Sequence, residues 1–305
     1  MKRIVMAVTA VALVAAALAA WGGAVPLATS GADAPSQAKP KPKLPPLPAN
    51  IKERGRWIIG VKCDVPPFGY INVRGQNAGF DVDIAKWFAR FAFGKASRVS
   101  YVCAPTPARE PLLTTDRVDL VISTFTYNAD RESRIDFSRA YYKASGRLLV
   151  KNDGPVQSLS NLFGRTVATT SGSVYDSWLK KCFPQAKPLV FDSFTNTVLA
   201  LRDGRADAVM WDDTAVLGIA TTDRSLKLTN DVFLQGPYGI GIKQGKASLK
   251  KWVDSRLNLM KQRDLFVGIL KNNVPARLFV AFQNNVLRPK NNFGYNAVDP
   301  QTVCP

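Results

Sequence analysis

The segment Val121–Phe137 combines groups that can hold a small carboxylate. It begins as a short apolar strand, continues with hydroxyl residues that include Thr124 and Thr126, and presents Arg131 about one helical turn later. Hydroxyls and free backbone groups at a strand end, followed by a guanidinium, can form paired charge-assisted hydrogen bonds to a carboxylate. A surface loop with a solvated arginine would carry the same residues, so other parts of the chain must separate the two interpretations.

A second hydroxyl-rich run could bind the same kind of group. Thr170, Ser171 and Ser173 directly precede a helix predicted to start near Val174. The N-terminus of a helix can bind a carboxylate through its N–H groups. A simple N-cap would explain one of these hydroxyls but not the whole run.

Composition excludes several classes of protein. The 305-residue chain has no histidine, which removes Ser-His and Cys-His catalysis and disfavours a structural zinc site. Its net charge of +18 suggests an anionic partner or ligand. The basic residues are scattered and match no nucleic-acid-binding motif, so we expect no nucleic-acid partner. We also expect no metal and no cofactor.

The N-terminus has the pattern of an export signal. Lys2 and Arg3 precede an apolar run, and small residues lead to Ala34, so residues 1–34 form either a cleaved signal peptide or a retained membrane anchor. We expect an extracytoplasmic protein. Residues 35–50 are rich in proline and lysine and predict an extended spacer.

Four cysteines in an exported chain predict two disulfides. Three pairings are possible, and the sequence does not choose between them. Cys63 and Cys103 both follow short strand-like runs, whereas Cys182 ends a helical segment and Cys304 lies near the C-terminus. We therefore favour Cys63–Cys103 and Cys182–Cys304.

Short apolar strands alternate with amphipathic helices after the spacer. Strands are predicted at residues 57–61, 99–102, 120–122 and 148–150, and a helix is predicted at residues 81–93. This alternation predicts an α/β fold with mainly parallel sheets covered by helices.

An internal repeat suggests two lobes. The segment LLTTDRVDLVI from Leu112 is echoed by LALRDGRADAVM from Leu199, and polar residues follow each buried strand. Ligands of open α/β sheets lie beyond the carboxyl ends of the strands. We predict lobe 1 at residues 51–147 and 239–287, lobe 2 at 153–238, hinge crossings at 147–152 and 238–243, and a C-terminal tail at 288–305.

Four motifs resemble a known family. They are GVKCDVPPFGY from Gly60, GFDVDIA from Gly79, STFTYNADRESRIDFSRAYY from Ser123 and ADAVMWDD from Ala206. In this order they resemble the polar amino acid solute-binding proteins of ABC transporters. The resemblance covers residues 55–270 and implies a two-lobe type II periplasmic binding protein fold with a two-strand hinge.

The resemblance implies roles for residues that meet the backbone end of an amino acid. Arg131 matches the arginine that grips the α-carboxylate, aided by Thr126. The Thr124 carbonyl and Asp212 match acceptors for the α-ammonium group, and Asp213 is the alternative to Asp212. Phe68 matches an aromatic floor of the pocket, although ordinary core packing would also explain it.

Residues that meet the ligand side chain would set specificity. Lys62 follows the first strand, and Arg109 matches a position at which binders of acidic amino acids place a cation. Two cations in a closed cleft are costly to desolvate without an anionic partner, so we expect glutamate or aspartate. Glutamine and asparagine remain the alternatives. Tyr238 resembles a cleft tyrosine beside the hinge.

The expected function is therefore capture of an acidic L-amino acid and its delivery to the permease of an ABC importer, without catalysis. The protein is expected to be a monomer. Two alternatives use the same fold: a membrane-anchored amino acid sensor, and a dehydratase in which Glu110 would supply a general acid.

Overall fold

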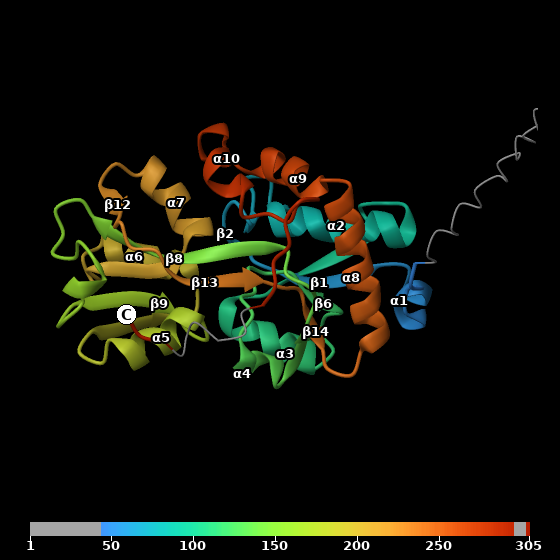
Figure 1. Cartoon of the computed structure of the whole chain (residues 1–305), viewed down its shortest axis with the longest axis horizontal. Helices are drawn as coiled ribbons and strands as arrows, with labels where there is room; N and C mark the ends of the chain where they lie inside the picture. The colour runs from blue at the N-terminus through green and yellow to red at the C-terminus, as the bar shows by residue number, and fades with distance from the viewer. Residues whose placement is uncertain (1–43, 296–302) are drawn as a thin grey trace, which may run out of the picture. The chain divides into compact units, whose positions relative to one another are not determined.

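The computed structural model describes residues 44–295 and 303–305, which form two α/β lobes (Figure 1). Lobe 1 is the sheet β5-β1-β6-β14-β7 with its helices, and lobe 2 is the sheet β10-β9-β11-β8-β12 with β13 added beside β8. The predicted export signal, residues 1–34, lies outside the described residues. No helix within the described ranges is long and apolar enough to cross a membrane.

The lobe 1 sheet is built mainly from parallel strands. Its strands are β1 (Trp57–Val61), β5 (Val99–Cys103), β6 (Leu120–Val121), β7 (Ile135–Phe137) and β14 (Gly241–Lys243). β1 lies parallel to both β5 and β6, while β14 runs antiparallel to β6 and β7. The strands predicted at 57–61, 99–102 and 120–122 are therefore present.

Helices cover both faces of the lobe 1 sheet. They are α1 (Ala49–Arg54), α2 (Phe80–Phe93), the 3-10 turn η1 (Thr106–Ala108), α3 (Arg109–Thr114), α4 (Ala129–Glu132), α8 (Ala247–Gln262), α9 (Leu265–Asn273) and α10 (Ala276–Gln283). One core joins α2, α8, α9 and α10 to the sheet through side chains such as Phe88 and Trp252. A smaller core on the other face includes Leu113 of α3 and Phe125.

Lobe 2 repeats this construction with a longer central strand. Its strands are β8 (Tyr142–Lys151), β9 (Thr166–Thr170), β10 (Lys187–Phe191), β11 (Ala208–Asp212), β12 (Leu226–Leu228) and β13 (Phe233–Tyr238). Its helices are the 3-10 turn η2 (Leu159–Asn161), α5 (Val174–Cys182), α6 (Phe194–Arg202) and α7 (Asp213–Thr222). β9 is parallel to β10 and β11, whereas β8 is antiparallel to β11, β12 and β13.

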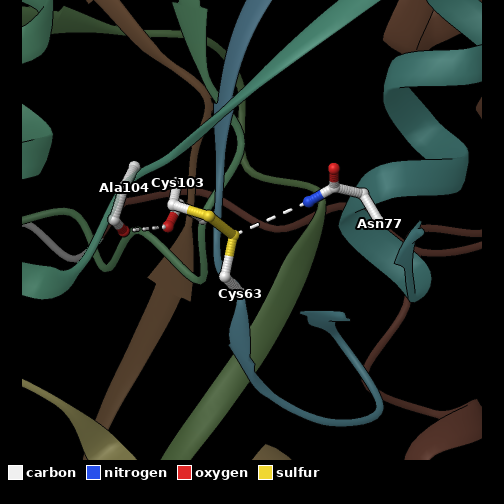
Figure 2. The surroundings of a disulfide bond; sticks show 5 residues. Cys63, Asn77, Cys103 and Ala104 are labelled. Carbon is white, nitrogen blue, oxygen red and sulfur yellow. Dashed lines mark hydrogen bonds between the residues drawn. A yellow bond between two sulfur atoms is a disulfide. The ribbon is translucent and has the colours of Figure 1, made fainter. Parts of the chain in front are cut away.

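A small sheet and a disulfide lie at the carboxyl end of β1. The strands β2 (Asp64–Val65), β3 (Gly69–Ile71) and β4 (Asn77–Ala78) form the small sheet. Cys63 bonds to Cys103 at the end of β5, and the Asn77 amide donates to the Cys63 sulfur (Figure 2). The other favoured pair, Cys182–Cys304, is also present.

Two adjacent segments of chain connect the lobes. Ser138 N–H donates to the Ile240 carbonyl over 2.9 Å, and Tyr141 N–H donates to the Tyr238 carbonyl over 3.0 Å. The second crossing thus includes Tyr238 and Ile240. Arg147 and the residues after it, which were predicted as the first crossing, pair with β11 and β12 inside lobe 2. β8 continues without a break from the first crossing into the lobe 2 sheet. The apolar residues of β8 therefore do not reveal where lobe 1 ends and lobe 2 begins.

The residues that follow α10 and those that precede α1 lie on lobe 1. Lys143 N–H donates to the Asn285 carbonyl, and Tyr295 stacks on Tyr127 with 3.9 Å between ring centroids. At the other end, Leu47 packs against the lobe 1 core. The last part of the predicted spacer is therefore packed on lobe 1, while residues 35–43 lie outside the described ranges.

Candidate ligand-binding site

The internal repeat places two strand ends at one cleft. In each copy an aspartate accepts a backbone N–H from the neighbouring strand: Asp119 from Ile58, and Asp207 from Thr166, both over 2.8 Å. β6 then leads to Thr124 in lobe 1, and β11 leads to Asp212 in lobe 2. Each lobe thus has the same hydrogen bond from the aspartate to the neighbouring strand, and each repeat strand leads to a residue that lines the cavity.

A small cavity of about 10 Å³ lies at these strand ends. It is lined from lobe 1 and lobe 2 by Thr106, Arg109, Thr124, Thr126, Ser173, Val174, Tyr175, Trp211 and Asp212. Five of these residues were predicted from the sequence as ligand-binding: Arg109, Thr124, Thr126, Ser173 and Asp212. Since the lining comes from both lobes, a ligand held here would contact both.

Arg131 lies beside this cavity and is 4% exposed. The Asn128 side chain accepts the Arg131 N–H over 2.7 Å and so caps α4. The guanidinium donates to the Thr126 carbonyl over 2.6 Å and, across the cleft, to the Gly172 carbonyl of lobe 2 over 2.7 Å. Arg131 therefore contacts both lobes.

Arg109 is held by backbone carbonyls. Its guanidinium donates to Thr106, Ser123 and Thr124 over 2.9 to 3.3 Å and lies 4.4 Å from the centroid of Phe125. Burial and the nearby charge of Arg131 lower the pKa of Arg109 to about 9. Its charge is thus stabilised largely within lobe 1.

Lys62 reaches the cavity wall through Thr106. The ammonium group donates to the Thr106 hydroxyl over 2.6 Å, and the residue is only 2% exposed. Burial, followed by repulsion from Arg109, lowers the pKa of Lys62 to about 7. A lowered pKa lets the amine lose its proton more readily, which reduces the cost of burying it.

Asp212 supplies the acidic side of the cavity. Tyr175 donates its hydroxyl to Asp212 over 2.6 Å. Burial raises the pKa of Asp212, and this hydrogen bond opposes the rise. The alternative residue, Asp213, begins α7 and does not line the cavity, so the position of Asp212 agrees with the preference for it.

The remaining predicted residues lie outside the cavity lining. Phe68 is buried in the lobe 1 core against Phe80, Tyr142 and Phe282, so core packing accounts for it. Tyr238 is also in that core, and its hydroxyl forms a hydrogen bond with the Thr214 hydroxyl.

Thr170 ends β9, and neither it nor Ser171 lines the cavity. Thr170 is fully buried, and the Ser171 N–H donates to the Phe191 carbonyl. Ser173 is therefore the residue of the hydroxyl run that reaches the cavity.

Glu110 lies on lobe 1 between two arginines. It is 3.5 Å from the Arg131 guanidinium and accepts a hydrogen bond from Arg134 over 2.7 Å. Its carboxylate is thus occupied by two arginines and does not line the cavity, which leaves it without a place as a general acid for a bound ligand.

Sequence reasoning did not select Thr106, Val174, Tyr175 or Trp211. Each lies within three residues of a residue that was selected, but a sequence does not show which neighbour turns toward the cleft. Of these four residues, Tyr175 could best have been predicted, because its phenolic hydroxyl lies close in sequence to the hydroxyl residues Thr170, Ser171 and Ser173.

Comparison with known proteins identifies the chain. Residues 57–272 match the family model described as bacterial extracellular solute-binding proteins, family 3. The chain belongs to this family. This agrees with the family that the four motifs indicate, the polar amino acid solute-binding proteins of ABC transporters.

Individual members support the assignment. The ABC transporter glutamine-binding protein GlnH of Bacillus subtilis is 32% identical over 225 residues, covering 73% of this chain and 82% of GlnH. The glutamine-binding protein of Geobacillus stearothermophilus is 35% identical over 193 residues, covering 63% of this chain and 74% of that protein.

A solved structure extends the comparison to the fold. The solute receptor for L-cysteine of Neisseria gonorrhoeae superposes with a TM-score of 0.72 at 29% identity, covering 74% of this chain and 92% of that one. The predicted two-lobe type II periplasmic binding protein fold is thereby confirmed. The family consists of solute-binding proteins and not of enzymes.

Proposed function

We propose that this solute-binding protein captures glutamine between its lobes and delivers it to the permease of an ABC importer. One observation carries the proposal for an amino acid ligand: Arg131 and Thr126 of lobe 1 lie at the same cleft as Asp212 of lobe 2. A carboxylate and an ammonium group on one carbon would find a complementary charge on each lobe.

Delivery requires that the ligand bind the closed form better than the open one. Contacts with both lobes at once provide that preference. Arg131 already bonds to both lobes, and Ser173 and Asp212 complete the cavity from lobe 2.

The buried cations do not require an acidic ligand, contrary to the expectation from the sequence. Arg109 donates to three backbone carbonyls, and burial lowers the pKa of Lys62 to about 7. An amide side chain can accept hydrogen bonds from such groups without bringing a second charge into the cleft. The two glutamine-binding relatives favour the same ligand.

Glutamate is the second candidate because of Lys62. Among the described residues its ammonium group has one hydrogen-bond acceptor, the Thr106 hydroxyl, although an ammonium can donate three hydrogen bonds. A ligand carboxylate would raise the pKa of Lys62 and keep it charged.

Isothermal titration of unfolded and refolded protein with glutamine, glutamate, asparagine and aspartate tests the ligand. Refolding removes amino acids that survive purification. Glutamine should bind with the lowest dissociation constant, and glutamate should bind at least about 10-fold more weakly, a difference of about 1.4 kcal/mol. Tighter binding of glutamate than of glutamine would contradict the amide proposal.

The variant Arg131→Ala tests the shared amino acid site. It should abolish detectable binding of all four ligands because each carries the same α-carboxylate. Arg117→Ala is the matched control, since Arg117 is exposed in the turn between α3 and β6. Equal affinities for the Arg131→Ala variant and the control would refute the assigned role of Arg131.

A further inference from the structure

Asp81 is a buried carboxylate that lies outside the cavity lining. It is on the first turn of α2 and is 0% exposed. One carboxylate oxygen accepts the Thr124 N–H over 2.8 Å, and the other accepts the Tyr141 hydroxyl over 2.9 Å. A buried carboxylate costs free energy unless it is hydrogen-bonded. Asp81 therefore favours the conformations in which the Thr124 N–H and the Tyr141 hydroxyl stay within hydrogen-bonding distance of it.

Asp81 is itself held in place by its own backbone. Phe80 N–H donates to the Pro67 carbonyl over 3.0 Å, and Asp81 N–H donates to the Phe68 carbonyl over 2.9 Å. Gly79 has φ 122°, and a side chain there would collide with the Phe68 carbonyl. The first turn of α2 is therefore docked on the preceding loop, and its positive end favours the carboxylate.

Thr124 needs such a restraint. It has φ 43°, a left-handed conformation that is unfavourable for a β-branched residue and persists only when its surroundings enforce it. Its N–H is bound by Asp81, and its carbonyl accepts the Arg109 guanidinium over 2.9 Å. Two buried side chains thus hold the two polar backbone groups of this cavity residue.

Tyr141 extends the same network to the crossings. Its N–H donates to the Tyr238 carbonyl of the second crossing, and its carbonyl accepts the Leu287 N–H over 3.1 Å. One carboxylate therefore joins a residue that lines the cavity to the chain segments that connect the lobes.

We propose that Asp81 is a positioning residue for ligand binding, which holds Thr124 in its left-handed conformation and fixes it relative to the first crossing. The inference rests on the proposed function, since it takes Thr124 as part of an amino acid site. It assigns a role to the GFDVDIA motif, which the cavity lining does not explain.

Two substitutions at Asp81 test this role against Asp83→Asn as the control. Asp83 lies on the same turn of α2 and bonds to Lys86 and Asn273, away from the cavity. Asp81→Asn keeps an oxygen that can accept the Thr124 N–H, and its NH2 group can donate to the Tyr141 hydroxyl in place of accepting from it. Asp81→Ser shortens the side chain so that it reaches neither.

The readouts are glutamine affinity by titration calorimetry and hydrogen exchange of the Thr124 N–H in the ligand-free protein. Asp81→Ser should weaken binding by about 10- to 100-fold and speed exchange at Thr124 by at least about 10-fold. Asp81→Asn and Asp83→Asn should stay within about threefold of the parent protein in both measurements.

The proposal is overturned if folded Asp81→Ser binds like the parent protein, or if Asp81→Asn loses as much affinity as Asp81→Ser. Should Asp81→Ser not fold, the result with Asp81→Asn decides: retained affinity and slow exchange support positioning, and loss of either contradicts it. If the parent protein binds no amino acid, the proposed function fails, while exchange at Thr124 still tests the contact.

Discussion

The guanidinium groups of Arg109 and Arg131 both lie over Phe125, at 4.4 and 5.2 Å from its ring centroid. A buried guanidinium is tolerated where carbonyls, carboxylates or aromatic rings replace water. Arg109 finds these partners within lobe 1, whereas Arg131 also bonds to lobe 2. Opening of the cleft would therefore break a hydrogen bond of Arg131 but would leave the carbonyl contacts of Arg109 in place.

Asp213 gives a prediction for pH dependence. Burial, followed by repulsion from Asp212, raises the pKa of Asp213 to about 7. Between about pH 4 and 7 the folded protein then holds a proton that the unfolded chain has released, so stability falls as the pH rises. Asp213→Asn should reduce this fall by at most about 1.4 kcal/mol per pH unit, as measured by urea unfolding of the ligand-free protein.

Asp223→Asn is the control, because the pKa of Asp223 is shifted in the opposite direction from that of Asp213. Hydrogen bonds from Ser225 lower the pKa of Asp223, so this residue contributes stability that is lost as the pH falls. Because that loss occurs below about pH 4, Asp223→Asn should leave the slope between about pH 4 and 7 unchanged. The same slope in both variants would contradict the assigned protonation of Asp213.

At the scale of elements, α5 and α6 begin in the same way but only α5 begins at the cavity. Ser173 accepts the Asp176 N–H over 3.1 Å, and Ser193 accepts the Asn196 N–H over 3.2 Å. Both serines are N-caps, and Ser173 also lines the cavity. Comparison of Ser173 with Ser193 can therefore distinguish the effect of helix capping from the effect of ligand binding.

Ser173→Ala and Ser193→Ala should each destabilise the protein by about 1 kcal/mol through loss of the cap. Only Ser173→Ala should also weaken ligand binding, by about 3- to 10-fold, because only this hydroxyl faces the cavity. Thermal unfolding and titration calorimetry measure the two effects. Equal affinity in the two variants would exclude a ligand contact by Ser173.

At the scale of the whole described chain, the C-terminal tail contacts both lobes. Tyr295 stacks on Tyr127 and donates its hydroxyl to the Ser138 carbonyl at the first crossing. Cys304 is bonded to Cys182 of α5, and the Val303 carbonyl accepts the Trp178 indole N–H over 3.0 Å. The tail thus begins on lobe 1 and ends in a covalent bond to lobe 2.

Removal of a disulfide should cost more stability when the loop that it closes is longer, with a logarithmic dependence on loop length. The Cys182–Cys304 bond spans 122 residues, and Cys63–Cys103 spans 40. The chain-entropy relation predicts that replacing both cysteines of the longer loop by serine costs about 1 kcal/mol more than the same change in the shorter one. Urea unfolding of the two double-serine variants checks this. A smaller effect from the longer loop would show that the tail restrains the unfolded chain little.

Much of this fold was predictable because it depends on local patterns. The strand Trp57–Val61 was predicted with its observed bounds, and α2 with a difference of one residue, since buried apolar spacing and flanking turns fix such elements. The repeated Asp119 and Asp207 were also visible in the sequence, and both bind the neighbouring strand. The first crossing was misplaced because nothing local interrupts β8.

The sequence by itself determined the family, the two α/β lobes and the residues at the strand ends, because these follow from motifs and periodicity along the chain. Only the tertiary structure decided which side chains share the cavity and how each charge is satisfied. Arg109 and Lys62 were expected to face an acidic ligand. In the structure Arg109 donates to backbone carbonyls, and Lys62 donates to the Thr106 hydroxyl while burial lowers its pKa. Burial and hydrogen bonding depend on residues distant in sequence, so composition and spacing do not reveal them.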